Sequence, residues 1–523
     1  MSVLKSALRT VFAALEALLG RAFPPAWNPL LNLGALGFFF YWVITASGIY
    51  VYIFFDTGVT QAFQSVEYMT RDQWYAAGIM RSLHRYASDG LVVVALLHLL
   101  REFSLDRARG VRWFSWVTGI PALALIYVAG ISGYWLVWDT LAQYVAIVST
   151  EWLDKLPFFG QPIARNFLSP DTLESRFFTL MIFLHIAVPL VALFVLWLHL
   201  QRVMKPRINP PLGLVSGAGV TLLALSLIHP AVSQAPADLA RVPGRVGLDW
   251  FYLGAYPLIE RLPGTATWTA ALGALVIMLA IPWLPPLRQQ RKAVVNLDNC
   301  NGCTRCAEDC PYTAITMQPR SDGLPFEGEA VVNPSLCVSC GICAGACPTS
   351  TPFRRMSELT PGIDLPDRAI ATIRADVEAE AAKLQGAPRI IMFRCANAGP
   401  AERHRSATVG VVPVNCSGHL PPSFIDYVLS RRHAEGVVVA GCPENACHNR
   451  LGGEWTAQRI AGLRDPHLRA RVPRERLKLF WSGQMEEARL GRELQSFAQE
   501  LGRMGPYQPA RPAAAQKGHP ADA

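Results

Sequence analysis

Four apolar stretches in the first 200 residues each contain a pair of chemically special residues 14 positions apart. Two stretches carry glycine pairs and two carry histidine pairs: Gly34 and Gly48, Gly119 and Gly133, His84 and His98, His185 and His199. Fourteen α-helical residues fall about 40° short of four complete turns, so each pair lies on one face of its helix, roughly 21 Å apart. The repeated interval predicts four helices that enclose two stacked, flat, metal-containing rings.

The residue types suit two b-type haems. Imidazole is a common axial ligand of haem iron, and glycine has no Cβ, so a flat ring can approach the helix backbone. A membrane zinc or di-iron site is the alternative, but it would use carboxylates beside the histidines, and helix-spaced Glu-x-x-His pairs are absent from these stretches. A lone histidine in an apolar helix can also be an ordinary core residue. We expect all four histidines to be iron ligands.

The apolar residues are concentrated in the first 290 positions of the 523-residue chain, whereas the rest reads as soluble protein. Six stretches are long enough to cross a bilayer. They lie at about residues 32–54, 81–100, 115–138, 178–201, 213–230 and 266–284. Residues 1–23 precede them as an amphipathic, mildly basic helix that suits the membrane surface and not a cleavable signal peptide. The predicted fold of residues 1–290 is an all-α, six-helix membrane bundle.

Basic residues predict the orientation of this bundle. They gather before the first span and after the second, fourth and sixth spans, with Lys5, Arg109, Lys205 and Arg291 as examples. Loops rich in Lys and Arg lie on the cytoplasmic side, so we expect both termini in the cytoplasm and the bundle in the inner (cytoplasmic) membrane. The formal net charge of +9 is largely this orientation signal, and it requires no nucleic-acid partner.

Residues 28–285 resemble cytochrome b of the quinol-oxidising bc complexes. The matching words include Arg81-Ser-Leu-His84, Trp116-Val-Thr-Gly119 and Gly133-Tyr134. The resemblance implies the pairing of the haem ligands, His84 with His185 and His98 with His199. It also implies that the chain forms a homodimer, because bc-type cytochromes usually dimerise.

Two arginines lie one helical turn from predicted ligands. Arg81 precedes His84 by three residues, and Arg101 follows His98 by three, so each guanidinium could pair with a haem propionate. Anchoring at the membrane interface is the alternative role. The resemblance to cytochrome b implies the first role, with Trp116 also near the propionates.

The loop before the last span extends the resemblance. Leu248-Asp249-Trp250-Phe251-Tyr252 stands where the family has Pro-Glu-Trp-Tyr, and Tyr256 follows in the matching place. In the family this stretch lines the outer quinol site, and its Glu takes part in quinol binding and proton transfer. The resemblance therefore implies a quinone site with Asp249 and Tyr256 in catalytic positions. A loop that serves only in packing is the alternative.

All 12 cysteines follow the last predicted span. The first eight form two copies of the pattern Cys-x-x-Cys-x-x-Cys-x-x-x-Cys-Pro, from Cys300 to Cys310 and from Cys337 to Cys347. The doubled pattern resembles bacterial ferredoxins with two [4Fe-4S] clusters, in which the fourth cysteine of each copy binds the other cluster. A zinc ribbon would leave half of these cysteines idle, and a cytoplasmic position disfavours disulfides.

The ferredoxin resemblance assigns the eight cysteines to two sets of ligands. The first thiol set is Cys300, Cys303, Cys306 and Cys347. The second thiol set is Cys310, Cys337, Cys340 and Cys343. We therefore predict a small α+β ferredoxin domain at residues 291–350, followed by a helical linker at 351–386.

Residues 387–485 are predicted to form an α/β domain with a parallel sheet. Short β-branched runs alternate with helical segments, and the expected strands are Arg389–Cys395, Thr408–Cys416, Gly436–Cys442 and Leu477–Trp481. Side chains just past the carboxyl ends of such strands gather at one edge, the usual ligand edge. The four remaining cysteines, here the third thiol set, are sufficient for one iron–sulfur cluster: Cys395, Cys416, Cys442 and Cys447. Purely structural thiols are the alternative.

The words around the third thiol set resemble the delta subunit of methyl-viologen-reducing hydrogenase. They are Asn415-Cys-Ser-Gly418 and Gly441-Cys-Pro-Glu-Asn-Ala-Cys-His448. That subunit binds a [2Fe-2S] cluster and relays electrons between a hydrogenase and a flavoprotein of the heterodisulfide-reductase type. The resemblance implies such a cluster and such a cytoplasmic partner here. Residues 486–523 are predicted as a helix followed by a disordered tail.

Together these motifs predict the electron-transfer subunit of a quinone-linked oxidoreductase, with a path from the third cluster through the ferredoxin clusters and the haems to quinone. The chain has no recognisable flavin, nicotinamide or nickel motif, so the partner must act on the primary substrate. Two alternatives stay open. The membrane part could only anchor a docking module without quinone turnover, or quinol oxidation could drive electrons toward low-potential cytoplasmic acceptors.

Overall fold

The computed structural model describes residues 2–24, 27–157, 162–163, 168–169, 172–201, 208–284, 291–443, 447–483 and 486–508. The chain divides into two compact units, Met1–Leu287 and Arg288–Ala523, and each is considered by itself. Two earlier predictions lie outside the described residues: the basic cluster around Lys205 and the disordered tail beyond residue 508.

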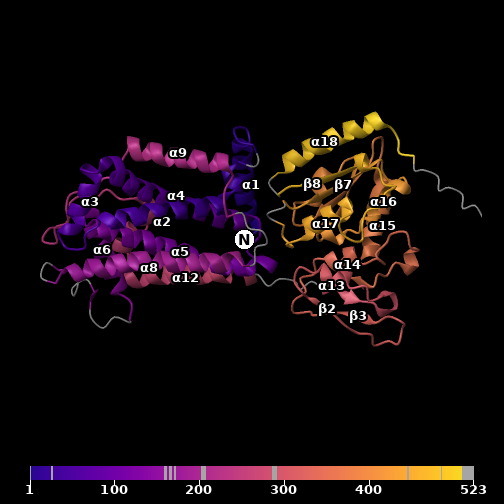
Figure 1. Ribbon diagram of the computed structural model, residues 1–523, viewed down its shortest axis with the longest axis horizontal. Helices are drawn as coiled ribbons and strands as arrows, with labels where there is room; N and C mark the ends of the chain where they lie inside the picture. Colours follow the sequence, from indigo (N-terminus) through magenta and orange to yellow (C-terminus); the bar gives the residue numbers. More distant parts are fainter. Residues whose placement is uncertain are drawn as a thin grey trace, which may run out of the picture. The chain divides into compact units, whose positions relative to one another are not determined.

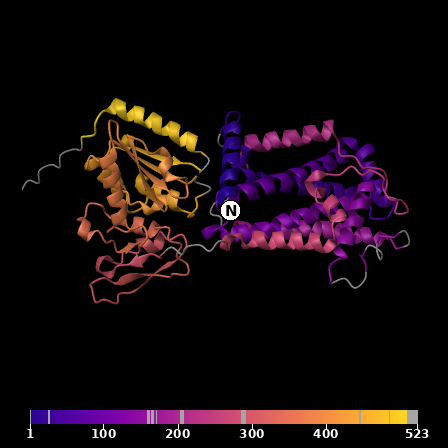
Figure 2. The same cartoon turned by 180° about the vertical axis from the view of Figure 1, so that it is seen from behind.

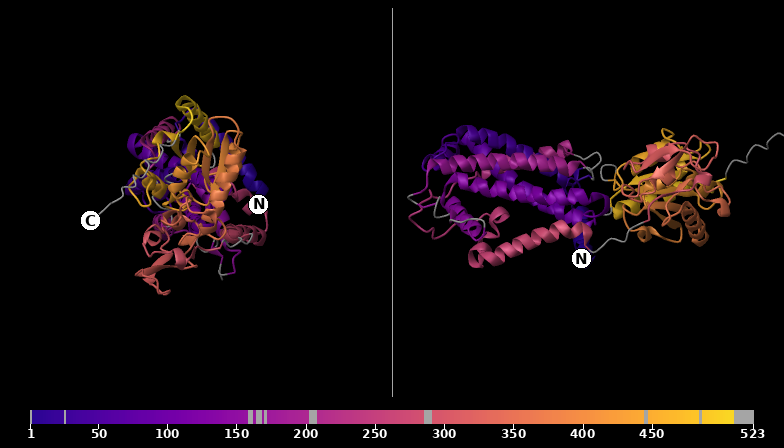
Figure 3. Two further views of the ribbon diagram at one scale, coloured as in Figure 1. Left: turned by 90° about the vertical axis from the view of Figure 1, so that its right-hand side faces the viewer. Right: turned by 90° about the horizontal axis from the view of Figure 1, so that it is seen from below.

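The first unit is a bundle of apolar helices that run alongside one another (Figures 1 and 3). Among the described residues, five are long and apolar enough to cross a membrane, three of them with the short turns that extend them. They are α2 (Leu33–Phe54), α4 (Ile79–Ser104), α5 (Trp113–Val137), α8 (Ser175–Leu200) and α12 (Gly264–Ala280). The sixth predicted span is α9 (Leu212–Ile228), whose 17 residues stand at the short end of the spanning range. The predicted all-α membrane bundle is confirmed, and the chain is an integral membrane protein.

Shorter helices complete the first unit. α1 (Ser2–Leu19) exposes several apolar side chains, including Val3 and Leu18, as the surface-helix prediction requires. Two further helices, α3 (Gln61–Arg71) and α6 (Thr140–Leu153), were not predicted. The loop before α12 contains α10 (Trp250–Leu253) and α11 (Tyr256–Arg261). The bundle pairs each glycine helix with a histidine helix, because α2 packs along α4 and α5 along α8.

The second unit begins with a small α+β domain. Strands β2 (Ile315–Pro319) and β3 (Gly328–Val332) form an antiparallel hairpin, and α13 (Arg305–Glu308) and α14 (Ile342–Ala346) carry cysteines toward its core. A second antiparallel pair joins β1 (Val294–Val295) to β4 (Ile363–Asp364). Part of the segment expected to be a linker is therefore a strand of this domain.

The rest of the second unit is built on a parallel sheet, as predicted. Its strands are β5 (Ile390–Cys395), β6 (Val409–Val414), β7 (Gly436–Gly441) and β8 (Leu477–Trp481), in the spatial order β6-β5-β7-β8. Helix α18 (Glu487–Met504) covers one face, whereas α15 (Ile370–Lys383) and α16 (Ser423–Ser430) pack on the other (Figures 1 and 2). All residues of β5 and β7 are buried, which is why these strands read as continuous apolar runs.

The order of the strands creates a topological switch point. The chain leaves β5 for β6 on one side and then returns to place β7 on the other side of β5. In open α/β sheets, ligands bind at the carboxyl ends of the two strands where the direction of winding reverses. Here those strands are β5 and β7, which end at Cys395 and Gly441.

Candidate metal centres

Each predicted histidine ligand faces one of the special glycines on the neighbouring helix. A Cβ atom on Gly48 would stand 2.9 Å from Cε1 of His84, and one on Gly133 would stand 2.9 Å from Cε1 of His185. The same relation holds at 3.7 Å between Gly34 and His98 and at 3.2 Å between Gly119 and His199. The groups closest to these glycines are thus imidazoles, whereas the sequence predicted that the flat haem ring would lie against them.

Backbone carbonyls orient the imidazoles of His84 and His185. Nδ1 of His84 donates to the carbonyl of Ile44 at 2.9 Å, and Nδ1 of His185 donates to the carbonyl of Ala129 at 3.0 Å. Each acceptor lies four residues before the glycine that the imidazole touches. A carbonyl can only accept, so Nδ1 carries the proton and Nε2 keeps its lone pair. Histidines that bind metals are held in this way.

The distance between the imidazoles of His84 and His185 suits one iron ion bound between them. The ring centroids of His84 and His185 are 6.2 Å apart, and metal–nitrogen bonds of about 2 Å on either side would place two such centroids roughly 6 Å apart. The imidazoles of His98 and His199 are close enough to interact electrostatically, and Nδ1 of His199 lies 3.3 Å from Oγ1 of Thr118. The residues present therefore fit the haems that the sequence predicts.

The residues expected near the propionates have protein partners. Arg81 donates to the hydroxyls of Thr70 and Ser233, the second at 2.9 Å. Arg101 Nε donates to Oε1 of Glu16 in α1 at 2.8 Å. The indole of Trp116 donates to the carbonyl of Met278 at 2.7 Å. Arg101 thus fastens the N-terminal helix to α4.

Asp249 lies in a largely buried polar network. Its carboxylate accepts hydrogen bonds from Arg85 of α4 and from the hydroxyl of Tyr134, and only 7% of the side chain is exposed. The other oxygen caps α10 by accepting from the amide of Phe251 at 2.8 Å. Arg85 also donates to Asp89 at 2.8 Å. Sequence reasoning missed Arg85, although an Arg and an Asp four residues apart within an apolar span was a usable signal.

The second predicted quinone residue lies on the same loop but has separate contacts. The hydroxyl of Tyr256 is 2.7 Å from Oγ of Ser149 in α6. Its neighbour Tyr252 is buried against Gly130 of α5 and lies 2.6 Å from Oγ of Ser88. The structure brings Asp249 and Tyr252 together around α4 and α5, whereas Tyr256 lies against α6.

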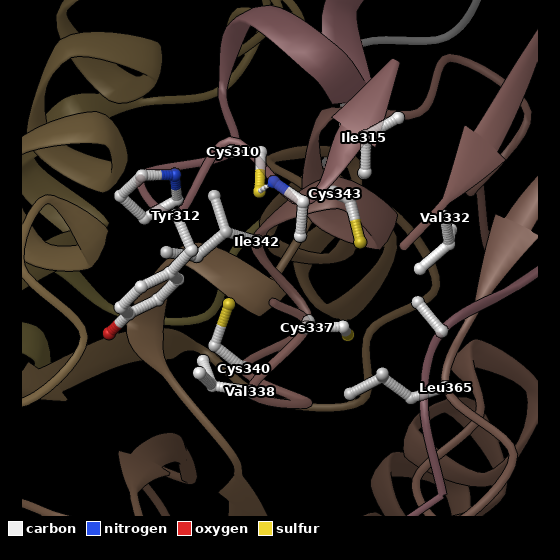
Figure 4. A pocket seen from close by; sticks show the side chains of 14 residues that line it. Cys310, Tyr312, Ile315, Val332, Cys337, Val338, Cys340, Ile342, Cys343 and Leu365 are labelled. Atoms are coloured by element: carbon white, nitrogen blue, oxygen red, sulfur yellow. Dashed lines mark hydrogen bonds between the residues drawn. The ribbon is translucent and has the colours of Figure 1, made fainter. Parts of the chain in front are cut away.

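The second thiol set converges on one apolar pocket (Figure 4). All four cysteines of the set line it, together with Tyr312 and apolar side chains such as Ile315 and Leu365. Burial, and after it the neighbouring thiols, raise the pKa of Cys340 to about 12. A group of buried thiols resists ionisation until a cation is present, and bound iron would provide that charge.

The first thiol set forms a second group in the same domain. Burial and then the thiols of Cys347, Cys303 and Cys300 raise the pKa of Cys306 to about 12. The other three members of its predicted set are thus among the thiol neighbours of Cys306, together with Cys343 of the second set. Within the described ranges, no three His, Cys, Asp or Glu side chains are close enough to hold a single metal ion. The thiols of a cluster bind different irons, so the wider spacing suits the predicted clusters.

The third thiol set lies at the switch point of the parallel sheet. Cys395 ends β5 and Cys442 follows β7, and their sulfur atoms are 3.9 Å apart. Cys416 follows β6, and α17 (Gly452–Ala461) begins beside it. A Cβ atom on Gly452 would stand 2.1 Å from Sγ of Cys416 and 3.8 Å from Sγ of Cys447. The fold therefore places Cys395 beside Cys442, and Cys416 and Cys447 beside Gly452, a residue that sequence reasoning missed.

A buried cation lies beside the third thiol set. Arg394 is fully buried and pairs with Glu487 of α18 at 2.6 Å. It interacts electrostatically with the thiols of Cys395 and Cys442. The same carboxylate is 2.6 Å from Nε2 of His404. A positive group next to thiolates favours their charged form.

Replacing Gly452 by alanine is expected to eliminate the third centre. The new methyl group would collide with the sulfur of Cys416, because 2.1 Å is far inside the contact distance. The matched control is Gly453→Ala, in which the nearest atoms, in Trp481, are 3.7 Å away. Iron content and the EPR spectrum of the reduced protein would show one centre lost in the first variant alone. Equal spectra in both variants would contradict the assignment.

Comparison with known proteins gives three separate matches. Residues 18–206 match the family of cytochrome b/b6/petB, residues 299–351 match the 4Fe-4S dicluster domain, and residues 390–505 match the delta subunit of methyl-viologen-reducing hydrogenase. Cytochrome b of Rhodospirillum rubrum is 24% identical over 293 residues, which cover 50% of this chain and 71% of the relative. A solved structure described as hyperthermophilic respiratory Complex III is 18% identical, with a TM-score of 0.41, and the match covers 49% of this chain and 75% of that chain.

The predicted resemblances are thus confirmed in each part of the chain. Cytochrome b carries b haems, and the dicluster domain carries [4Fe-4S] clusters. The chain is a membrane electron-transfer subunit that joins a segment matching cytochrome b/b6 to a segment matching the 4Fe-4S dicluster domain and a segment matching the hydrogenase delta subunit.

Proposed function

We propose that this subunit carries electrons between a cytoplasmic redox partner and the quinone pool of the inner membrane. The observation that carries the proposal is the presence, on one chain, of an imidazole pair spaced for iron and three groups of converging thiols. When bound, haem and iron–sulfur centres accept and release single electrons. The direction favoured here is from the partner to quinone.

The chain's own residues hold the centres in place. His84 and His185 would hold one haem and His98 and His199 the other, with the imidazoles of the first pair fixed by backbone carbonyls. The first and second thiol sets would hold the two [4Fe-4S] clusters, and the third set a [2Fe-2S] cluster. The apolar side chains that line the second thiol set would limit the access of water to its cluster.

Two features favour a partner of the kind that the hydrogenase delta subunit serves. The third thiol set belongs to the matched segment, and its member Cys447 is only half-buried, whereas the other three are buried. We therefore propose a heterodisulfide-reductase-type flavoprotein or a hydrogenase as the cytoplasmic electron donor. The positive-inside pattern supports a cytoplasmic position for both termini, and a homodimer is proposed from the resemblance to cytochrome b.

Reduction of one quinone consumes two electrons, which the partner supplies, and two protons. Asp249 is proposed to handle a proton, and Tyr256 to contact the quinone. The carboxylate of Asp249 would first have to leave Arg85 and Tyr134, which now occupy one of its oxygens. The short side chain of Asp249 could reach a ligand only after that exchange.

Substitution of Asp249 tests this proposal. The full chain would be reduced anaerobically and mixed rapidly with a quinone analogue while haem absorbance and cluster EPR are followed. Asp249→Asn is expected to slow reoxidation by roughly 100-fold, the lower range for a lost acid–base group. The control is Asp238→Asn in the same loop, whose side chain is 52% exposed. Equal rates of reoxidation for the unaltered chain and Asp249→Asn would show that the Asp249 carboxylate takes no part in the quinone reaction.

A second function is favoured by the same network. Because Asp249 is already paired with Arg85, the loop could serve packing alone. The helix bundle would then only anchor the iron–sulfur domains, which dock the partner, to the membrane. In that case the reduced haems stay reduced when the quinone analogue is added, in both the unaltered chain and the variants.

A further inference from the structure

Two iron–sulfur domains of the second unit meet through backbone contacts. Helix α14, which carries Cys343, packs against the short turn η9 (Ser417–His419), which directly follows Cys416. A Cβ atom on Gly345 of α14 would stand only 2.0 Å from the carbonyl oxygen of Gly418. Any side chain at position 345 would therefore force the two domains apart.

Further contacts keep this junction closed. Arg459 of the C-terminal domain is fully buried, and it donates across the junction to the carboxylate of Asp309 and to the carbonyl of Ile342, the second at 3.4 Å. Asn415 donates to the carbonyl of Ser339 at 3.1 Å. The imidazole of His419 is also fully buried and lies against Gly341, where a Cβ would stand 2.4 Å from Cγ of the ring. At these residues the described parts of the two domains are in direct contact.

The thiols on the two sides of the junction interact. Cys340 of the second set interacts electrostatically with Cys416 of the third set. Tyr312 lines the pocket of the second set (Figure 4). Cζ of Arg450, in the C-terminal domain, lies 4.9 Å from the centroid of the Tyr312 ring, so this ring contacts both domains. The thiol neighbours of Cys306, in contrast, all belong to its own domain.

We propose that the second thiol set, and not the first, exchanges electrons with the third set, and that the contact between Gly345 and Gly418 fixes their separation. The inference deepens the proposed function, on which it rests. In each exchange one electron leaves the iron of one centre, which is oxidised, and enters the iron of the other, which is reduced. No bond forms or breaks, and no proton moves. Gly345 is a positioning residue, because it sets the distance without touching either centre.

The test uses the full chain in detergent with its centres loaded and chemically reduced by dithionite. In this reduced sample, EPR reports the spin–spin interaction between the third centre and the ferredoxin centres. In a second sample, whose centres start oxidised, freeze-quench after a photoreductant pulse reports the rate of electron exchange. Gly345→Ala is expected to weaken the interaction and to slow exchange several-fold. The control is Gly502→Ala in α18, where a Cβ would meet no atom within 4 Å, and both quantities should stay unchanged.

A pair of ligand variants keeps the proposal testable if Gly345→Ala fails to fold. Cys340→Ser removes a ligand of the second set, and Cys303→Ser removes one of the first. The spin interaction of the third centre should vanish in Cys340→Ser and persist in Cys303→Ser. The reverse pattern, or an unchanged interaction in Gly345→Ala, would overturn the proposal. None of these measurements involves quinone, so their failure is distinct from failure of the proposed function.

Discussion

A chain in which His84 is replaced by alanine is expected to bind one haem instead of two and to lose electron transfer to quinone. The imidazole is positioned by its hydrogen bond to the carbonyl of Ile44, and its ring centroid lies 6.2 Å from that of His185. No other imidazole lies opposite His185 among the described residues, so the iron would keep a single axial ligand. The haem content of the purified chain, measured as pyridine haemochrome, and the low-spin EPR signals would each fall by half.

The control for this variant is His229→Ala. His229 directly follows α9, and its ring lies 3.0 Å from the hydroxyl of Tyr86. It is not one of the four histidines that face the special glycines. This variant should keep both haems. Two haems in His84→Ala, or a loss in His229→Ala, would show that the ligands have been wrongly assigned.

Replacing Asp309 by asparagine is expected to destabilise the second unit by about 3–5 kcal/mol, because a buried charge then loses the opposite charge that compensates it. Asp309 of the ferredoxin domain is 3% exposed, and it accepts hydrogen bonds from Arg459 and Arg464 of the C-terminal domain. Arg459 is fully buried, so the loss of its carboxylate leaves a cation without compensation. Hydrogen exchange of the amides of β5 and β7 in the full chain, across a urea series, would measure the change.

A second ion pair between the same two domains provides the control. Asp465 pairs with Arg305 at 2.8 Å, but the two side chains are 51% and 34% exposed. Exposed pairs of this kind contribute at most about 1 kcal/mol, so Asp465→Asn should have a small effect. If the two variants shift the urea midpoint equally, burial of the Asp309 network does not contribute to stability.

The interval of 14 residues was sufficient to predict that each special pair lies on one face of its helix, because helical periodicity turns sequence distance into position on a face. That each glycine helix packs along a histidine helix was not predicted. The carbonyls that orient His84 and His185 were beyond sequence reasoning, since every residue has a carbonyl and its neighbour is set by packing. Arg101 shows the same limit. Its partner Glu16 is 85 residues away. Local spacing therefore could not show whether Arg101 pairs with a haem propionate or with the carboxylate of Glu16.

In the second unit, the strands of the parallel sheet were predicted almost to the residue, because fully buried strands are continuous apolar runs. The segment 351–386 was harder to interpret. Its strand β4 has only two residues, too few for a periodic pattern, and its helix α15 supplies Ile370 and Ile373 to the core of the C-terminal domain. The domain boundaries themselves stay a prediction.

The position of the third thiol set has a consequence for how the protein is made. In the first and second sets, three thiols stand within one short segment, so iron can be captured before distant parts of the chain meet. Cys395, Cys416 and Cys442 come together only when β5, β6 and β7 are side by side, and such long-range pairing is slow. Insertion of the proposed third iron–sulfur centre is therefore expected to follow formation of the sheet, so that iron would enter a site that is already folded.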